Sequence, residues 1–384
     1  MAIYELQQIV SDTTRKFIRN SVAPLAAEID ENETFPLDNF KEMGRLGLLG
    51  IPFDEGVEGL NLDYSAYIQF VRELAAECAS TAMTVVAHSS LCGNPIHKFG
   101  TDRQKSTYLH RLVTGQSIGA FALTEPDSGS DMASMRTRAI EEKDHYVLTG
   151  SKTFITNANV ANVFIVAAST EPSKRMLGLS LFIVDRDLQG VSLSDKKERK
   201  LGMRGADMGE IHFNQVVVPK DNMIGRKNLG LEVLHDTLAT ARIGMAAIAV
   251  GIAEGAQRHC LKYVKQRKQF NQYLFQFQTI KNMLADMEMN LNAARLLLEK
   301  AVSLKDRGEP FVKEASEAKL FASEAAMRIT KDVVQIFGGY GYSRELPLER
   351  MFRDAKLTEI GDGTSEIQRL IIAEELIKKQ RSIQ

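Results

Sequence analysis

The sequence is poor in cysteine, has no excess of either charge and contains no long hydrophobic run. Its three cysteines, Cys78, Cys92 and Cys260, lie far apart and match no metal-ligand spacing, which indicates buried or free thiols in a reducing compartment. The 48 basic and 49 acidic side chains nearly cancel, which argues against nucleic acid or an anionic membrane as the main partner. No apolar run approaches ~18 residues, so no membrane-spanning helix is expected. We predict a cytoplasmic protein without a metal site.

The chain has 384 residues, 44% of them hydrophobic, which is enough for two or three domains with a large core. The N-terminal segment has the pattern of an amphipathic helix rather than a signal peptide, and helical periodicity continues to about residue 114. Short β-branched and aromatic runs separated by turn residues follow. Long helical segments return from about residue 229. The predicted fold is α+β and multidomain, with an N-terminal helical domain at 1–118, a central β-barrel or β-sandwich domain at 119–228 and a C-terminal four-helix bundle at 229–384.

Four segments contain residue types that suit a flat, charged cofactor, although each also has a simpler structural explanation. FALTEPDSGSD (121–131) leaves a strand and becomes a loop whose hydroxyls and backbone N–H groups suit an anion or a flavin. TFITN (153–157) offers Phe154 for stacking and is equally a plain strand. QRKQF (266–270) pairs positive charge with an aromatic ring, as a helix C-terminus also does. QIFGGYGY (335–342) has paired glycines that allow close backbone approach or simply end a helix.

One carboxylate near the C-terminus, Asp362, lies between two glycines in the string IGDGTSEIQR. Gly-Asp-Gly is ordinary turn chemistry, so the local sequence alone favours a turn residue. Ser365 and Gln368 have the spacing of a capping box, which predicts a helix that starts just after Asp362 and runs through Ile377. A carboxylate on a loop that leads into a helix is also well placed for proton transfer, so both interpretations stay open at this point.

Taken in order, these segments resemble the acyl-CoA dehydrogenase family over essentially the whole chain. LTEPDSGSD is similar to the family's flavin signature, and RKQF is similar to its intersubunit flavin contact. Further sequence motifs of the family are similar to GGYGY, LADME and RDAKLTEIGDGTSEIQR. RIGMAAIAVGIA and KEASEAKLFASEAA are similar to the short-chain branch. The resemblance implies helical, β and helical domains in that order, and FAD as cofactor. It also implies loss of an α-proton from an acyl-CoA thioester while the β-hydrogen leaves as hydride to FAD N5.

The resemblance also assigns site residues by position. Those expected to bind FAD at the isoalloxazine loop, the covering strand and the positions after the catalytic residue are Phe121, Leu123, Thr124, Gly129, Ser130, Phe154, Thr156, Thr364 and Glu366. Those expected to reach FAD from a neighbouring subunit are Arg267, Gln269, Phe270, Gln278, Gln335 and Gly339. Those expected to contact the acyl-CoA are Ser130, Arg242, Gly361 and Gly363. The second group implies a homotetramer, and the family implies an electron-transferring flavoprotein as the electron acceptor.

The position of the family's catalytic acid differs in this chain. Most relatives have Glu in a Tyr-Glu-Gly-Thr string, whereas this sequence has Asp362 in Gly-Asp-Gly-Thr. A branch resembling isovaleryl-CoA dehydrogenase instead places Glu one residue before the arginine that Arg242 matches, and that position here is Ala241. Asp362 is therefore the only carboxylate at either location, and we predict that it is the α-proton base. Ala239 also stands where many relatives have Asp, so a CoA contact by an acid there is not expected.

Two substitutions beside the base bear on the substrate. Asp is shorter than Glu by about 1.3–1.5 Å, and Gly361 replaces a Tyr, which predicts an empty volume beside the α- and β-carbons. A short, branched or alicyclic acyl group such as cyclohexanecarboxyl would fill that volume. Three alternatives remain: 1,4-elimination on a cyclic enoyl-CoA, with His88 as the only titratable candidate in the pocket-floor segment 85–95, enoyl-CoA reduction at the same site, or a catalytically silent flavin- or CoA-binding homologue.

Overall fold

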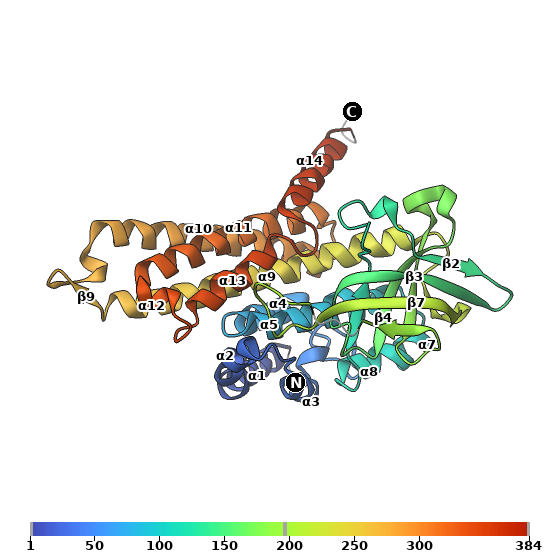
Figure 1. Cartoon of the computed structure of the whole chain (residues 1–384), viewed down its shortest axis with the longest axis horizontal. Helices are drawn as coiled ribbons and strands as arrows, with labels where there is room; N and C mark the ends of the chain where they lie inside the picture. The colour runs from blue at the N-terminus through green and yellow to red at the C-terminus, as the bar shows by residue number, and fades with distance from the viewer. Residues whose placement is uncertain (1–2, 195–197, 382–384) are drawn as a thin grey trace.

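The computed structural model describes residues 3–194 and 198–381. The first part of the chain is a layer of helices, in which apolar residues three and four positions apart form buried faces, as with Tyr67, Phe70, Val71 and Leu74. The helices are α1 (Ile3–Phe17), α2 (Ala26–Glu31), α3 (Leu37–Arg45), α4 (Tyr64–Ala75), α5 (Ala79–Val85), α6 (Asn94–Phe99), α7 (Asp102–Gln104) and α8 (His110–Val113), with a π-helix, η5 (Val86–Gly93), between α5 and α6. This layer lies below the bundle, next to the sheet (Figure 1).

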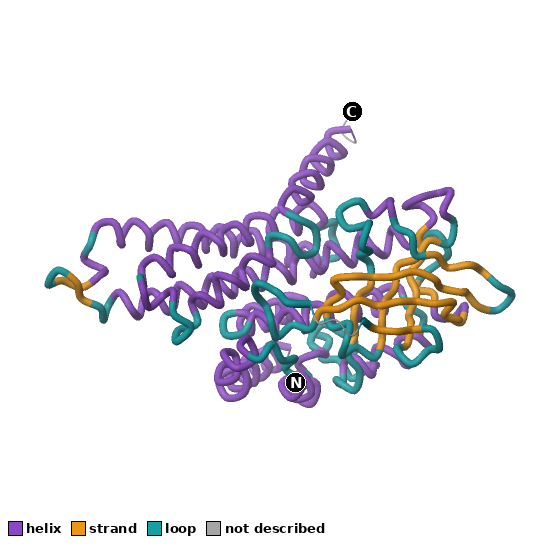
Figure 2. Tube along the Cα trace, viewed as in Figure 1, coloured by secondary structure: helices purple, strands orange, loops and turns teal. Residues whose placement is uncertain are grey.

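The central region is one mixed sheet of eight strands (Figure 2). Its strands are β1 (Gly119–Ala122), β2 (Arg138–Glu141), β3 (His145–Thr156), β4 (Val163–Ser169), β5 (Leu179–Asp185), β6 (Val191–Leu193), β7 (Met208–Pro219) and β8 (Met223–Ile224). The order is β6-β7-β3-β2-β4-β5-β8, and β1 pairs in parallel with β4. Every residue of β4 is buried, which explains its unbroken apolar run, whereas β7 alternates because one of its faces is exposed.

The C-terminal region is a bundle of long helices. Its elements are α9 (Gly230–Val264), a hairpin of β9 (Lys268–Gln269) and β10 (Gln272–Tyr273), α10 (Gln278–Asp306), α11 (Val312–Phe337), α12 (Gly339–Tyr342), α13 (Leu348–Thr358) and α14 (Ser365–Arg381). The first of these, α9, packs against α11 in the bundle and against α4 and η5 in the N-terminal layer. The last, α14, projects away from the other helices (Figure 1).

Helix α9 is apolar on all sides because other elements surround it. In the described part of the chain it alone is long and apolar enough to cross a membrane, and 94% of its most apolar stretch is buried inside the protein. Its composition is therefore that of a core helix. Its central position also lets it contribute side chains to the space between the bundle and the sheet.

Candidate active site

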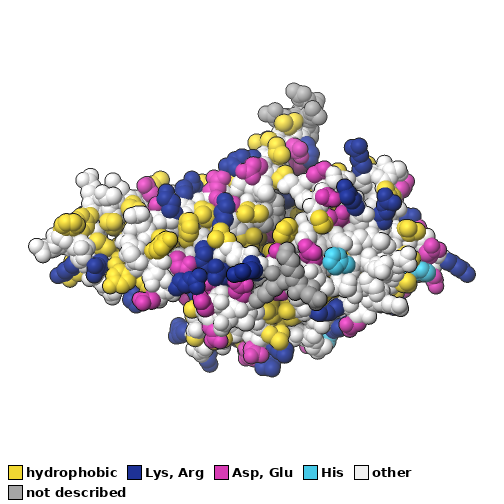
Figure 3. Space-filling model, viewed as in Figure 1, with side chains coloured by type: hydrophobic (Ala, Val, Ile, Leu, Met, Phe, Trp, Pro, Cys, Tyr) yellow, Lys and Arg dark blue, Asp and Glu magenta, His cyan; other side chains and the backbone are white. Residues whose placement is uncertain are grey.

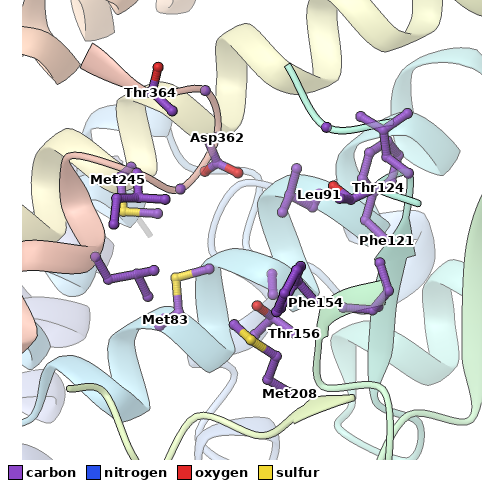
Figure 4. Close-up of a pocket in the computed structure, with 18 of the residues that line it drawn as sticks. Met83, Leu91, Phe121, Thr124, Phe154, Thr156, Met208, Met245, Asp362 and Thr364 are labelled. Atoms are coloured by element: carbon purple, nitrogen blue, oxygen red, sulfur yellow. The ribbon is translucent and has the colours of Figure 1, made fainter. Parts of the chain in front are cut away.

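A cavity of about 580 Å³ lies where the N-terminal layer, the sheet and the bundle meet (Figure 4). Side chains from α5 and η5, from β1 and its following loop, from β3, from α9 and from the loop between α13 and α14 line it. Its wall is mostly apolar, with Met83, Ala87, Leu91, Met208 and Leu238 among its members. An apolar cavity with a few polar groups is the usual form of a small-molecule site.

The cavity collects most of the residues that the sequence predicts for the flavin and the substrate. Those that line it are Phe121, Leu123, Thr124, Gly129, Ser130, Phe154, Thr156, Arg242, Gly361, Asp362, Gly363 and Thr364. Glu366 is exposed on α14 and is not part of the lining. Separate elements thus bring the residues of two predicted groups, cofactor-binding and substrate-binding, into one space.

A buried ion pair holds the loop after β1 against β3. Lys152 Nζ lies 2.8 Å from Glu125 Oε1 and also donates to the Leu123 carbonyl at 2.9 Å. Glu125 also accepts hydrogen bonds from the backbone N–H groups of Arg136 at 2.6 Å and Thr137 at 3.0 Å. Burial raises the pKa of Glu125, but the Lys152 charge and these hydrogen bonds outweigh it, so the pKa is lowered and the carboxylate stays ionised. The pair therefore positions Leu123 and Thr124 at the cavity.

Phe154 lies in an irregular part of β3. Its φ is +55°, and the pairing register between β3 and β7 shifts between Lys152 and Ile155. This bulge turns Phe154 out of the strand alternation, and the ring is 60% exposed although it lines the cavity. Thr156, two residues on, lines the same wall (Figure 4).

These walls fit a flat cofactor. The exposed ring of Phe154 offers a stacking surface, and a Cβ added to Gly129 would meet no atom within 4 Å, so the loop leaves open space at that point. The hydroxyls of Thr124, Ser130 and Thr156 add hydrogen-bonding groups to the lining. The residues present therefore suit an isoalloxazine ring.

The loop between α13 and α14 carries Asp362 in a left-handed conformation, with φ 54, and Gly363 follows with φ 96. Three side chains hold its carbonyl groups. Arg242 Nε donates to the Asp362 carbonyl at 3.3 Å, and Lys319 Nζ donates to the Gly363 carbonyl at 2.7 Å. Gln368 Nε2 donates to both carbonyls, at 3.1 and 2.8 Å. The loop is thus fixed by α9, α11 and α14 together.

The carboxyl group of Asp362 is buried, and its Oδ2 has no hydrogen-bond partner. Burial raises the pKa of Asp362, and the charges of Lys319 and Arg242 oppose that shift. Burial also lowers the pKa of Lys319 to about 8 and that of Arg242 to about 10, although the Asp362 carboxylate opposes both changes. Within the described residues Asp362 is the only carboxylate that lines the cavity. It is an unpaired acid aimed at an apolar space.

The structure corrects the predicted capping box. Thr364, not Ser365, caps α14, because its Oγ1 accepts from the Ile367 N–H at 3.4 Å. Gln368 uses its side chain on the Asp362 loop instead, and Ser365 Oγ is buried without a partner. The helix itself starts at Ser365 as expected and continues to Arg381.

The structure also corrects the expectation of an empty volume beside Gly361. A Cβ placed on Gly361 would lie 2.8 Å from Cε of Met245, so a methionine from α9 already occupies part of that space. Sequence reasoning missed Met245 because its helix lies far from the loop along the chain. Lys319 and Gln368 were missed for the same reason.

His88 is a core residue rather than a base. It is 1% exposed and is not among the residues that line the cavity. Its Nδ1 accepts from the Gly119 N–H at 3.0 Å, and its Nε2 lies 3.1 Å from the Leu112 carbonyl. Burial lowers the pKa of His88 to about 4, so the ring is neutral at pH 7 and both nitrogens are used. The 1,4-elimination alternative therefore loses its candidate base.

The residues predicted to reach FAD from a neighbouring subunit lie elsewhere, at what we call the distal end: the hairpin β9–β10 and the start of α12, far from the sheet (Figure 1). Arg267, Gln269 and Gly339 line a second, more open cavity of about 570 Å³ there. Phe270 is 88% exposed. Gln278 and Gln335 are exposed as well. One subunit therefore does not bring the two groups together.

No group of three or more His, Cys, Asp or Glu side chains within residues 3–194 and 198–381 is arranged to hold a metal ion. The three cysteines are buried and unpaired. The donor groups at the cavity are hydroxyls, backbone groups and one carboxylate, which suit an organic cofactor better than a metal.

Sequence models of the acyl-CoA dehydrogenase N-terminal, middle and C-terminal domains match residues 4–116, 120–216 and 228–377. The chain belongs to the acyl-CoA dehydrogenase family. It is 45% identical over 372 residues to the short-chain specific acyl-CoA dehydrogenase of Clostridium acetobutylicum, covering 97% of this chain and 98% of the relative. It superimposes on the butyryl-CoA dehydrogenase of Megasphaera elsdenii with a TM-score of 0.95, at 41% identity and 98% coverage of each chain.

A solved structure from work on the electron transferring flavoprotein of Acidaminococcus fermentans is similarly close, with a TM-score of 0.94, 40% identity and coverage of 96% and 97%. Members of the acyl-CoA dehydrogenase family bind FAD, and this acyl-CoA dehydrogenase is an FAD-dependent oxidoreductase. The predicted family, fold, enzyme class and cofactor are confirmed.

Proposed function

We propose that this acyl-CoA dehydrogenase converts an acyl-CoA thioester to the 2-enoyl-CoA with Asp362 as the base that removes the α-proton. The observation that carries the proposal is the position of Asp362 as the only carboxylate lining the cavity in the described part of the chain. Bound FAD supplies the acceptor for the β-hydrogen. The family supports the reaction class, and the lining of the cavity supports the choice of base.

The environment of Asp362 suits proton abstraction. A carboxylate in water is a weak base, and burial raises the pKa of Asp362 toward the range where it accepts a proton more readily. The charges of Lys319 and Arg242 limit that rise, because they favour the ionised form of the carboxyl group. The two side chains also bind the carbonyl groups of the loop, which keeps the carboxyl group in place during the reaction.

The backbone beside the base offers a group for the thioester oxygen. The N–H of Asp362 makes no hydrogen bond with another described residue. It precedes the N-terminus of α14, where unpaired N–H groups and the helix dipole favour negative charge. An N–H there stabilises the charge that develops on the thioester oxygen as the proton leaves.

We propose a short acyl group, branched or alicyclic at the α-carbon. Asp362 is shorter than the Glu of most relatives, and the wall beside Gly361 is formed by the end of the Met245 side chain, which can move to admit a branch. Similarity to a short-chain specific enzyme and to a butyryl-CoA dehydrogenase supports the short length. Steady-state rates on butyryl, isobutyryl, isovaleryl and cyclohexanecarboxyl thioesters test the branching, and a clear preference for butyryl-CoA would contradict it.

We further propose a homotetramer in which the distal end of one subunit completes the FAD site of another. The distal end carries positive charge and an exposed aromatic ring at Arg267 and Phe270. Exposed apolar side chains also lie along the bundle and on α14, as expected for surfaces that other copies cover: Met289, Leu296, Leu370, Leu376 and Ile377 (Figure 3). Light scattering of the holoenzyme tests this, and a stable FAD-loaded monomer would contradict it.

An electron-transferring flavoprotein is the proposed electron acceptor, supported by the similarity to the structure from Acidaminococcus fermentans. The proposed location is the cytoplasm.

Anaerobic addition of acyl-CoA to the yellow holoenzyme tests the whole assignment, because a dehydrogenase is bleached by its substrate. A protein that no acyl-CoA bleaches, but that an enoyl-CoA reoxidises after chemical reduction, would instead be a reductase at the same site.

A further inference from the structure

The wall of the cavity next to Gly361 is supplied by α9 rather than by the loop itself. We propose that Met245 is the residue that determines which acyl groups fit beside Asp362, because it replaces from the helix the side chain that the loop lacks at position 361. The inference rests on the proposed function, in which the acyl group lies beside Asp362.

One atom of Met245, its Cε, limits the space beside Gly361. An ideal Cβ on Gly361 would lie 2.8 Å from Met245 Cε, which is too close for two carbon atoms. The next nearest atoms both belong to Leu357: its carbonyl oxygen at 3.5 Å and its Cγ at 4.0 Å. Met245 and Gly361 both line the cavity, and Met245 lies beneath the turn that carries Asp362 (Figure 4). The methyl group of Met245 therefore marks the boundary of the acyl site at this point.

The backbone of Met245 cannot move easily, whereas the end of its side chain can. Met245 is fully buried on α9, and a Cβ on the preceding Gly244 would already meet Val86 at 2.8 Å, so the helix is packed closely against η5. Methionine is unbranched and has three rotatable side-chain bonds, which lets its methyl group adopt several positions at low energy. The methyl group of Met245 can therefore move, whereas the helix that carries it cannot.

This arrangement separates two kinds of acyl group. A straight short chain leaves the Met245 methyl group where it is. A branch or ring at the α-carbon needs the space next to Gly361 and must displace that methyl group. Shortening Met245 should therefore favour a ring over a straight chain, and a larger rigid side chain at the same position should do the opposite.

The test measures the binding of two acyl-CoA thioesters under conditions that prevent turnover. In FAD-loaded enzyme that also carries Asp362→Asn, and whose flavin is kept chemically reduced so that it cannot accept a hydride, calorimetry gives the dissociation constants of butyryl-CoA and cyclohexanecarboxyl-CoA without turnover. Met245→Ala should shift their ratio toward the ring by about tenfold, the size of one or two methylene groups in an apolar pocket. Met245→Phe should shift it the other way. An unchanged ratio in both variants would overturn the proposal.

A double-mutant cycle with Gly361→Ala provides the matched control. The new methyl group should push Met245 and weaken binding of the ring, and Met245→Ala should remove most of that loss, so the two changes are coupled. Met83 also lines the cavity, but it is not among the atoms nearest to the Gly361 Cβ, so Met83→Ala should combine additively with Gly361→Ala. Equal coupling in the two cycles would show general loosening of the cavity and overturn the assignment to Met245.

The binding ratio separates this inference from the proposed function. If Asp362 is not the base, turnover and α-proton exchange persist in Asp362→Asn, while the effect of Met245 on the ratio of dissociation constants is unaffected. If Met245 is not the determinant, the ratio stays constant whatever Asp362 does. Thermal unfolding of each variant identifies any that has lost the fold, and the Phe variant, which creates no cavity, repeats the test in the other direction.

Discussion

The cavity around Asp362 and the distal end differ in how their residues are held. At the cavity, Arg242, Lys319 and Gln368 bind two successive carbonyl groups of one loop, and a buried ion pair fixes the opposite wall. At the distal end, Phe270 is largely exposed and the cavity lined by Arg267 is open. The loop that carries Asp362 is held by side chains of its own subunit, whereas the distal end leaves the ring of Phe270 largely exposed.

This contrast agrees with the different roles that we propose for the two regions, proton transfer at the cavity and cofactor binding at the distal end. Chemistry needs groups held to within a fraction of an ångström, which buried hydrogen bonds provide. Binding the remote part of a long cofactor needs mainly charge and apolar area, which an exposed hairpin can contribute to another copy. Substitutions in the two regions should accordingly affect different measurements.

The largest effect is expected at Asp362. Asp362→Asn should lower kcat by about 10²–10⁴-fold, the usual contribution of a general base, while FAD and acyl-CoA still bind. Exchange of the α-proton with deuterium oxide, followed by mass spectrometry, should stop. The control is Asp362→Glu, which keeps the carboxylate. Exchange that continues in the Asn variant would show that the base lies elsewhere.

Breaking the buried ion pair should have the next largest effect. Lys152→Met leaves the Glu125 carboxylate buried without its cation, which is expected to lower the free energy of unfolding by about 3–5 kcal/mol. Urea unfolding of the apoprotein measures this. Adding Glu125→Gln removes the unpaired charge and keeps one oxygen that can accept one of the two backbone N–H bonds, so it should recover part of the loss. Equal stability of the single and double variants would contradict the proposed role.

At the distal end, Phe270→Ala should leave the stability of the isolated subunit nearly unchanged, within about 0.5 kcal/mol, because the ring is exposed. FAD affinity should nevertheless fall by about tenfold or more if a second copy covers the ring. Leu177→Ala, an exposed apolar residue before the sheet strand β5, is the control and should change neither quantity. Unchanged FAD affinity in Phe270→Ala would remove the reason to combine two subunits at one site.

The smallest effect is expected at Lys319, which lies outside the cavity and whose charge lowers the pKa of the proposed base, Asp362. Because its charge lowers the pKa of Asp362, Lys319→Met should raise that pKa further. kcat/KM should rise with pH as Asp362 loses its proton, and in Lys319→Met this rise should occur at higher pH. At pH values below the rise, kcat/KM of the variant should be lower by about tenfold or less. Gln368 still binds the Gly363 carbonyl, so the loop should stay folded.

Lys319→Arg keeps the charge and serves as the control for that shift. A purely structural role for Lys319 would lower activity equally at every pH and leave the profile in place. Such a result would mean that Lys319 acts only through the Gly363 carbonyl.

The sequence was informative where a local pattern reports directly on structure. The change from helical to alternating and back to helical periodicity located the sheet between two helical regions. The order of short motifs identified the family. It also predicted which residues of the loop after β1 line the cavity, because a loop that approaches a cofactor needs small and hydrogen-bonding residues at adjacent positions. The same motifs showed that Asp362 was the acid to examine.

Only the tertiary structure could decide what surrounds that acid. Arg242 contacts the Asp362 carbonyl across 120 residues of sequence, and Lys319 contacts the Gly363 carbonyl across 44. The sequence predicted His88 on the pocket floor, but the structure buries it in the core, and Met245 from another helix occupies part of the space beside Gly361. Composition and periodicity record which side chains are buried, whereas contacts between distant helices depend on how those helices pack.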